Sequence, residues 1–96
     1  MAKRPMPQLV AEYHLKGFDQ ETIEMRKGAE IFTMFHQNGV PTLFCLCPSE
    51  ERGTEHRTFL NLRTGAVLPP HCRYIGSYQD FGGAFVEHVF EKLPGT

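Results

Sequence analysis

Three arginines and a glycine pair are the residues of this chain that could bind an anion. Arg57 and Arg63 are six residues apart in an alternating segment, and even spacing places both side chains on one face of a strand. A guanidinium group holds phosphate through two parallel hydrogen bonds. Arg73 lies on the strand that leads to Gly82-Gly83, where successive backbone N–H groups could form an anion-binding nest.

These groups together predict a pocket for a phosphate-bearing ligand such as a nucleotide. A base could stack on an aromatic ring of the same region, because stacking tolerates any base. The predicted ligand-binding residues are Arg57, Arg63, Arg73, Tyr74, Tyr78, Gln79, Phe81, Gly82, Gly83 and His36. The sequence alone favours a competing interpretation, a hairpin turn with solvated arginines and core aromatics, since neither arginine clusters nor glycine turns are rare.

The chain has five histidines, and histidine is the side chain that most often acts as a general base. No Gly-x-Ser-x-Gly motif, cysteine–histidine signature or paired carboxylate cluster accompanies them. His36 lies beside an Asn-Gly turn, and His88 shares a strand face with Val86 and Phe90, which favours a partly buried, hydrogen-bonded histidine. The sequence therefore predicts no catalytic residue, and a small phosphodiesterase that uses His36 or His88 is the third alternative.

The cysteines are the remaining candidates for special chemistry. Cys45, Cys47, His71 and Cys72 could be taken for a zinc site, but the set lacks the paired knuckles with two-residue spacers that structural zinc commonly uses. We interpret them as core and loop residues and predict neither metal nor cofactor. Three cysteines do not make a disulfide framework, and the N-terminus lacks the apolar segment of a secretory signal, so we expect a cytoplasmic protein with reduced thiols.

The charge balance limits the class of partner. The chain has 96 residues, with 10 basic against 11 acidic side chains, whereas a general nucleic-acid binder usually carries a basic excess. No apolar run is long enough to cross a bilayer as a helix. The length suits one domain, which we place at residues 9–93, between a disordered tail at 1–8 and a frayed end at 94–96.

The element that must organise the domain is a predicted β-hairpin over residues 29–47. Asn38-Gly39 separates two apolar runs and suits a tight turn, which pairs Gln37 with Val40, and at the far end Ile31 with Leu46. Both faces of this hairpin are largely apolar. One can cover a core, and the second needs a further layer, a ligand or a partner, so we expect a homo-oligomer.

Shorter alternating segments surround the hairpin. We predict strands over residues 9–18, 22–25, 56–62 and 72–79, a Thr64-Gly65 turn that leads into a strand over 66–68, and the longest loop over 48–55. A short helix over 8–13 competes with the first strand, and the segment 84–93 fits a strand better than a helix. Gly76 indicates a bulge or a close backbone approach. Six to eight short strands indicate an all-β fold, a small antiparallel barrel or a two-layer sandwich.

Four short sequence motifs resemble those of a known protein family. Gln-Asn-Gly-Val-Pro at 37–41, Tyr-Ile-Gly-Ser-Tyr-Gln at 74–79, Gly82-Gly83 and His-Val-Phe-Glu at 88–91 resemble a small uncharacterised family of phage and prophage proteins. The resemblance implies a phage accessory protein that acts on the host. By analogy, it could sequester an immune signal such as a cyclic nucleotide or a cyclic ADP-ribose-like molecule. The alternative is an interaction module that inhibits a host protein through the apolar hairpin face.

Overall fold

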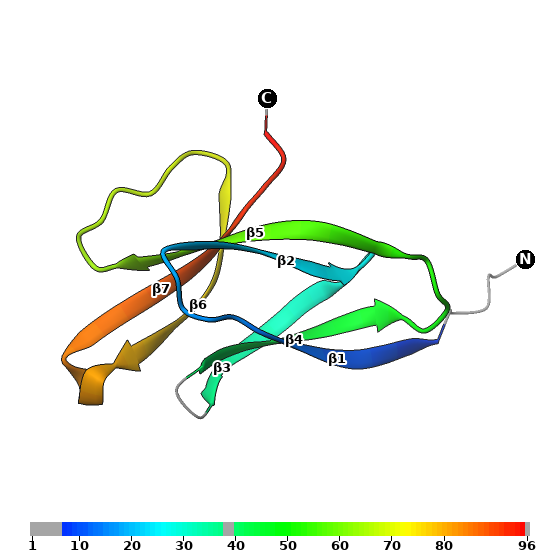
Figure 1. The fold of residues 1–96 in the computed structure, drawn as a ribbon, viewed down its shortest axis with the longest axis horizontal. Coiled ribbons are helices and arrows are strands. Elements are labelled where there is room, and N and C mark those ends of the chain that lie inside the picture. Colours follow the sequence, from blue (N-terminus) through cyan, green and yellow to red (C-terminus); the bar gives the residue numbers. More distant parts are fainter. Residues whose placement is uncertain (1–6, 38–39, 96) are drawn as a thin grey trace, which may run out of the picture.

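In the described part of the chain, seven antiparallel strands form two sheets. The computed structural model describes residues 7–37 and 40–95, and the strands are β1 (Gln8–His14), β2 (Gln20–Arg26), β3 (Glu30–Gln37), β4 (Val40–Pro48), β5 (Thr54–Arg63), β6 (Cys72–Asp80) and β7 (Phe85–Lys92). A short 3₁₀ turn, η1 (Phe81–Gly83), joins β6 to β7. The three-stranded sheet has the order β1-β4-β3, and the four-stranded sheet has the order β2-β5-β7-β6 (Figure 1).

This arrangement confirms the predicted all-β class and selects the two-layer sandwich, because the sheets do not close into a barrel. The core lies between the two sheets. Leu43, Cys45 and Cys47 of the central strand β4 are fully buried and form a cluster with Met25 and Phe59 of the other sheet. Alternation along the strands explains this, since every second side chain points to the same face. No helix in the described residues is long and apolar enough to cross a membrane.

The β3–β4 hairpin forms as predicted near its turn and departs from the prediction at its far end. Gln37 pairs with Val40 and Met34 with Leu43, as expected, but Ile31 lies opposite Cys45 instead of Leu46. A bulge between Ile31 and Thr33 shifts the register by one residue. The shift keeps Ile31 on the inner face, where it packs against the core. The Asn38-Gly39 turn itself lies outside the described residues.

The outer face of the three-stranded sheet carries apolar side chains at its surface. Val10 is 64% exposed, Phe32 is 54% exposed and Phe35 is 56% exposed. The ring of Phe35 meets that of Phe44 edge to face, with ring centroids 5.6 Å apart. The prediction of a second apolar hairpin face is therefore confirmed, and within the described chain this face has no covering layer.

Three local predictions about secondary structure have clear outcomes. The short helix over 8–13 was wrong, because this segment is β1, whereas the strand interpretation of 84–93 is confirmed by β7. Gly76 lies at a bulge, and a Cβ atom there would meet the Met34 side chain at 3.0 Å, so both suggested roles apply.

The predicted strand over residues 66–68 was wrong. It belongs to a loop over 64–71, which is longer than the segment between β4 and β5 that we expected to be the longest (Figure 1). This segment folds back on β5 only as far as a turn, with a hydrogen bond from Ala66 N to the carbonyl oxygen of Arg63 at 3.0 Å. Pro69 and Pro70 donate no hydrogen bonds, and Val67 is 89% exposed, which gives this segment nothing to pack against.

Candidate functional site

A buried carboxylate joins two of the predicted arginines at one end of the sandwich. Glu91, on the inner face of β7, is 5% exposed. Arg57 donates to it twice, from Nε to Oε2 at 2.6 Å and from Nη2 to Oε1 at 2.9 Å. Arg73 donates a third bond from Nη2 to Oε1 at 2.6 Å. Two cations on one carboxylate leave a net charge of +1 in the cluster.

The two arginines differ in how fully they are engaged. Arg57 also donates from Nη1 to the carbonyl oxygen of Ala29 at 2.6 Å, and its side chain is 11% exposed. Arg73 is held only by Glu91 among its described hydrogen bonds, and its side chain is 52% exposed. A guanidinium has five N–H groups, so Arg73 keeps donors available for a ligand. Arg57 acts mainly as the support that keeps Glu91 in place.

The ion pairs determine the protonation of this cluster. Burial raises the pKa of Glu91, but the hydrogen bonds and charges of Arg57 and then Arg73 outweigh it, so the pKa lies below its ordinary value. The hydrogen bond to Glu91 raises the pKa of Arg57, and this effect exceeds the lowering caused by burial. Both groups are therefore charged at neutral pH, and the cluster carries no proton that it could transfer easily.

Strand ends bring the cluster together. Arg57 lies near the start of β5, Arg73 near the start of β6 and Glu91 near the end of β7, and antiparallel pairing places these positions side by side. Ala29 belongs to the turn that leads into β3, in the opposite sheet. The cluster therefore bridges the two sheets at the end where the sandwich opens.

A cavity of about 890 Å³ lies against this cluster. Its charged lining consists of three bases (Arg57, Arg73, Lys92) and three acids (Glu30, Glu55, Glu91), and His56 also faces it. Ile31, Leu93 and Pro94 provide apolar contact area. The volume falls in the range of small-molecule sites, roughly 300–1,000 Å³. Phosphate would find Arg73 and Lys92 here, and ligand hydroxyl groups would find carboxylate acceptors.

Arg63 lies at the opposite end of the sandwich. Its Nε donates to Oε1 of Glu87 at 3.0 Å, and its guanidinium carbon lies 4.1 Å from the centroid of the Phe85 ring. A second cavity of about 600 Å³ there has one basic lining residue, Arg63, against three acidic residues, Asp19, Asp80 and Glu87. This charge opposes phosphate binding. Six residues along a strand span about 20 Å, so Arg57 and Arg63 share a face but serve different sites.

A family model covers almost the whole chain. The model of a domain of unknown function, DUF7352, matches residues 6–95. The protein belongs to the DUF7352 family. Neither a curated protein nor a solved structure matches the chain. The residue roles in this DUF7352 domain therefore rest on its own geometry.

Tyr74 and Tyr78, which were expected to stack on a ligand, line neither described cavity of the DUF7352 domain. Tyr78 is 8% exposed in the core, accepts a hydrogen bond from Asn61 Nδ2 at 2.8 Å and stacks on His36 with centroids 4.6 Å apart. Its burial raises the pKa of the phenol. Tyr74 lies on the outer face, against the ring of Phe90.

The glycine turn also lies apart from the Glu91 cavity. Gly82 and Gly83 adopt φ angles of 65° and 91° in η1, at the far end of β6 from Arg73. A Cβ atom on Gly83 would meet Gln79 Oε1 at 3.4 Å, so the Gln79 side chain lies beside this turn. The Phe81 side chain lies outside the description. Of the predicted ligand-binding residues, the structure therefore brings Arg57 and Arg73 together beside Glu91. It places Arg63, His36, Tyr74, Tyr78, Gln79, Gly82 and Gly83 elsewhere.

The cysteines of the DUF7352 domain do not gather around a common point with His71. Cys45 and Cys47 are fully buried on the inner face of β4, and Cys72 is partly buried at the start of β6. Burial, followed by the neighbouring Cys47, raises the pKa of Cys45 to about 11, so its thiol is protonated. Among residues 7–37 and 40–95, no three histidine, cysteine or acidic side chains form a group that could hold a metal ion.

Two residues that carry the site were absent from the predicted set. Glu87 and Glu91 point inward from β7, at 6% and 5% exposure, each against an arginine of β5. The available signal was their spacing, since two carboxylates four residues apart share a strand face and could meet Arg57 and Arg63. The apolar residues Val86 and Phe90 on the alternate face made that face look like the inner one.

Proposed function

We propose that this protein binds a phosphate-bearing small molecule, without converting it, in the cavity beside Glu91. The observation that carries the proposal is Arg73, which Glu91 fixes in place through one hydrogen bond while about half of its side chain is exposed. A guanidinium oriented in this way is ready to bind phosphate without first losing much rotamer freedom. Lys92 adds a second cation to the same cavity.

The carboxylates of the cavity favour a ligand that also carries hydroxyl groups. Glu30 and Glu55 line the cavity and accept hydrogen bonds, as a ribose would require. Free inorganic phosphate alone would make no use of them. The preferred ligand class is therefore a nucleotide-like molecule, such as a cyclic nucleotide or a cyclic ADP-ribose-like compound. In the phage setting that the sequence resemblance implies, the protein would sequester a nucleotide signal of the host's defence.

Native mass spectrometry with a panel of these nucleotides tests the proposal. We expect one intact nucleotide to be retained per site. Substitution Arg73→Ala should weaken binding by about 10- to 150-fold, because a charge-assisted hydrogen bond contributes about 1.5–3 kcal/mol. Arg52→Ala is the matched control, since Arg52 pairs with Glu50 in the β4–β5 loop and does not line the cavity. Equal affinity of the two variants would remove Arg73 from the site, and cleavage of the nucleotide would contradict sequestration.

A second candidate function is protein–protein interaction through the outer face of the three-stranded sheet. Val10, Phe32 and Phe35 are each more than half exposed there, which favours a homo-oligomer that buries this face. Sedimentation velocity over a concentration series tests it. Phe35→Asp should abolish self-association, whereas Val67→Asp, at an 89% exposed site in another loop, should not. A strictly monomeric protein would exclude a second copy as the occupant and leave a host protein as the alternative partner.

A further inference from the structure

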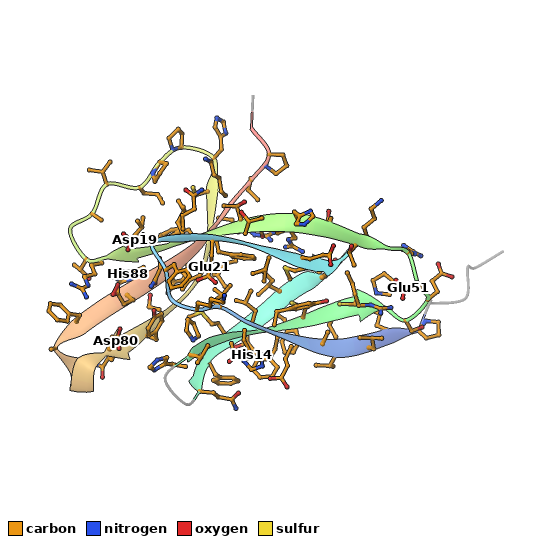
Figure 2. The ribbon with its side chains drawn as sticks, viewed as in Figure 1. His14, Asp19, Glu21, Glu51, Asp80 and His88 are labelled. Atoms are coloured by element: carbon orange, nitrogen blue, oxygen red, sulfur yellow. The ribbon has the colours of Figure 1, made fainter. Side chains whose placement is uncertain are left out.

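Four hydroxyl and imidazole groups form a hydrogen-bonded chain on the outer face of the four-stranded sheet. The Tyr74 hydroxyl lies 2.7 Å from Ser77 Oγ, and Ser77 Oγ lies 2.7 Å from His88 Nδ1. The Nε2 atom of His88 lies 2.8 Å from Thr64 Oγ1. Figure 2 labels His88 on β7, where it is the cross-strand partner of Ser77 on β6.

Proton counting allows this chain two directions, and one of them prepares Ser77 to act as a nucleophile. A neutral imidazole has one N–H donor and one acceptor nitrogen. When Nε2–H donates to Thr64 Oγ1, Nδ1 is free to accept the hydroxyl proton of Ser77. Tyr74 then donates its own proton to Ser77 Oγ. In this arrangement Ser77 has a base at hydrogen-bond distance, and that base is oriented by a third group, which is the arrangement that activates serine nucleophiles.

We propose that Ser77 is a nucleophile activated by His88 and that it accepts acyl groups from carboxylic esters. The surroundings favour an apolar acyl group over a phosphoryl group. Leu62 lies across from His88 on β5, and Val86 and Phe90 flank it on the same face of β7, so the closest strand neighbours of the imidazole carry no charge. Ser77 is exposed, and a small ester can reach it.

The acyl transfer is balanced by groups within this chain. Ser77 Oγ forms a bond to the ester carbonyl carbon while its proton moves to His88 Nδ1. The carbonyl oxygen becomes an oxyanion, and the Tyr74 hydroxyl is the donor close enough to Ser77 Oγ to stabilise it. Collapse breaks the bond to the leaving alkoxide or phenoxide, which takes the proton from His88. Water then releases the carboxylic acid by the same steps in reverse.

Thr64 is a positioning residue in this scheme. Its hydroxyl holds His88 through Nε2 and accepts the Nε2 proton in the tautomer that activates Ser77, but it lacks the negative charge of the carboxylate found in the serine–histidine–aspartate arrangement. A neutral acceptor stabilises the imidazolium less, and we therefore expect slow turnover. Labelling of Ser77 is consequently the more sensitive measurement.

The experiment treats the full-length protein with a fluorophosphonate probe and, separately, with p-nitrophenyl butyrate, and locates the label by peptide mass spectrometry. Ser49 and Ser77 are the two serines of the chain, so Ser49 in the β4–β5 loop is an internal control. We expect label on Ser77 and none on Ser49. His88→Asn should slow the labelling about 100-fold or more, because a positioned general base contributes about 10²–10⁴-fold.

Three variants separate catalysis from structural effects. Thr64→Val should slow labelling and Thr64→Ser should restore it, since serine keeps the hydroxyl beside Nε2 and valine lacks it. His14→Asn, on β1 of the other sheet and outside both the hydrogen-bonded chain and the cavities, should label at the wild-type rate. Equal labelling of Ser49 and Ser77, or an unchanged rate in a folded His88→Asn protein, would overturn the proposal. Thr64 and His14 are exposed and His88 is partly buried, and circular dichroism verifies that each variant is folded.

Discussion

Substitution of Glu91 by glutamine tests the energetic role of the cluster on which the ligand site depends. The change keeps the shape of the side chain and removes its charge. Arg57, whose side chain is 11% exposed, would then lose the carboxylate that it contacts and keep the Ala29 carbonyl and the more distant charge of Glu55. Arg73 is half exposed, so solvent can compensate for its loss. The cost of Glu91→Gln therefore comes mostly from Arg57.

The magnitude follows from the burial of that pair. Breaking a buried ion pair on one side costs about 3–5 kcal/mol, whereas exposed pairs are worth about 0–1 kcal/mol. A domain of this length has a total stability of roughly 5–14 kcal/mol, so Glu91→Gln removes a large fraction of it. With a urea m-value of about 1.5 kcal/mol/M, the unfolding midpoint should fall by about 2–3 M.

Urea unfolding followed by circular dichroism measures this loss. Glu87→Gln is the matched control, because its partner Arg63 is 52% exposed and should lose far less. The double substitution Arg57→Met with Glu91→Leu should recover most of the stability, since apolar residues of similar volume can replace a buried pair. If Glu91→Gln shifts the midpoint no more than Glu87→Gln does, the cluster is not the buried electrostatic centre that we describe.

Three further predictions concern acid, thiols and a turn. The pKa of Glu91 is lowered in the fold, so its stabilisation is present above its ordinary value of 4.5 and is lost as the pH falls through the folded pKa. Urea titrations from about pH 6 to pH 3 should therefore show a steeper acid loss for the wild type than for Glu91→Gln. Of the three thiols, Cys72 should react with a maleimide in the native protein, whereas the buried Cys45 and Cys47 should react only after unfolding, as mass spectrometry would reveal. Gly28 has a φ angle of 81° in the β2–β3 turn, so Gly28→Ala should cost about 1–2 kcal/mol by urea unfolding and Gly28→Asn less.

The hairpin shows what alternation predicts and where it fails. Periodicity and the Asn-Gly signal predicted the pairing from Gln37–Val40 down to Thr33–Phe44, because a two-residue side-chain repeat and a known turn length determine register. The bulge at Phe32 was not predictable, since it depends on what Ile31 meets in the other sheet. Similarly, residues 66–68 resemble a strand locally, and only the structure shows that they stand away from both sheets, with Val67 89% exposed.

The site was harder to predict because its key residue looked like a surface residue. A glutamate in an alternating segment normally points to solvent, and Glu91 is buried only because Arg57 and Arg73 meet it from two neighbouring strands. Sequence spacing related Arg57 to Arg63, which lie on one strand. The relation between Arg57 and Arg73 passes through β7 and required the strand order β5-β7-β6.

That strand order also makes the two proposed sites separable. Arg73 and Glu91 face inward from β6 and β7, whereas Ser77 and His88 face outward from the same two strands. The bulge at Gly76 adds one residue between Arg73 and Ser77, and this extra residue places them on opposite faces despite their even spacing. Ser77→Ala should therefore leave nucleotide binding unchanged, and Arg73→Ala should leave Ser77 labelling unchanged. If either substitution changed both nucleotide binding and Ser77 labelling, the two sites would be coupled through β6 and β7. Nucleotide binding could then not be assigned to the inner face alone, nor labelling to the outer face alone.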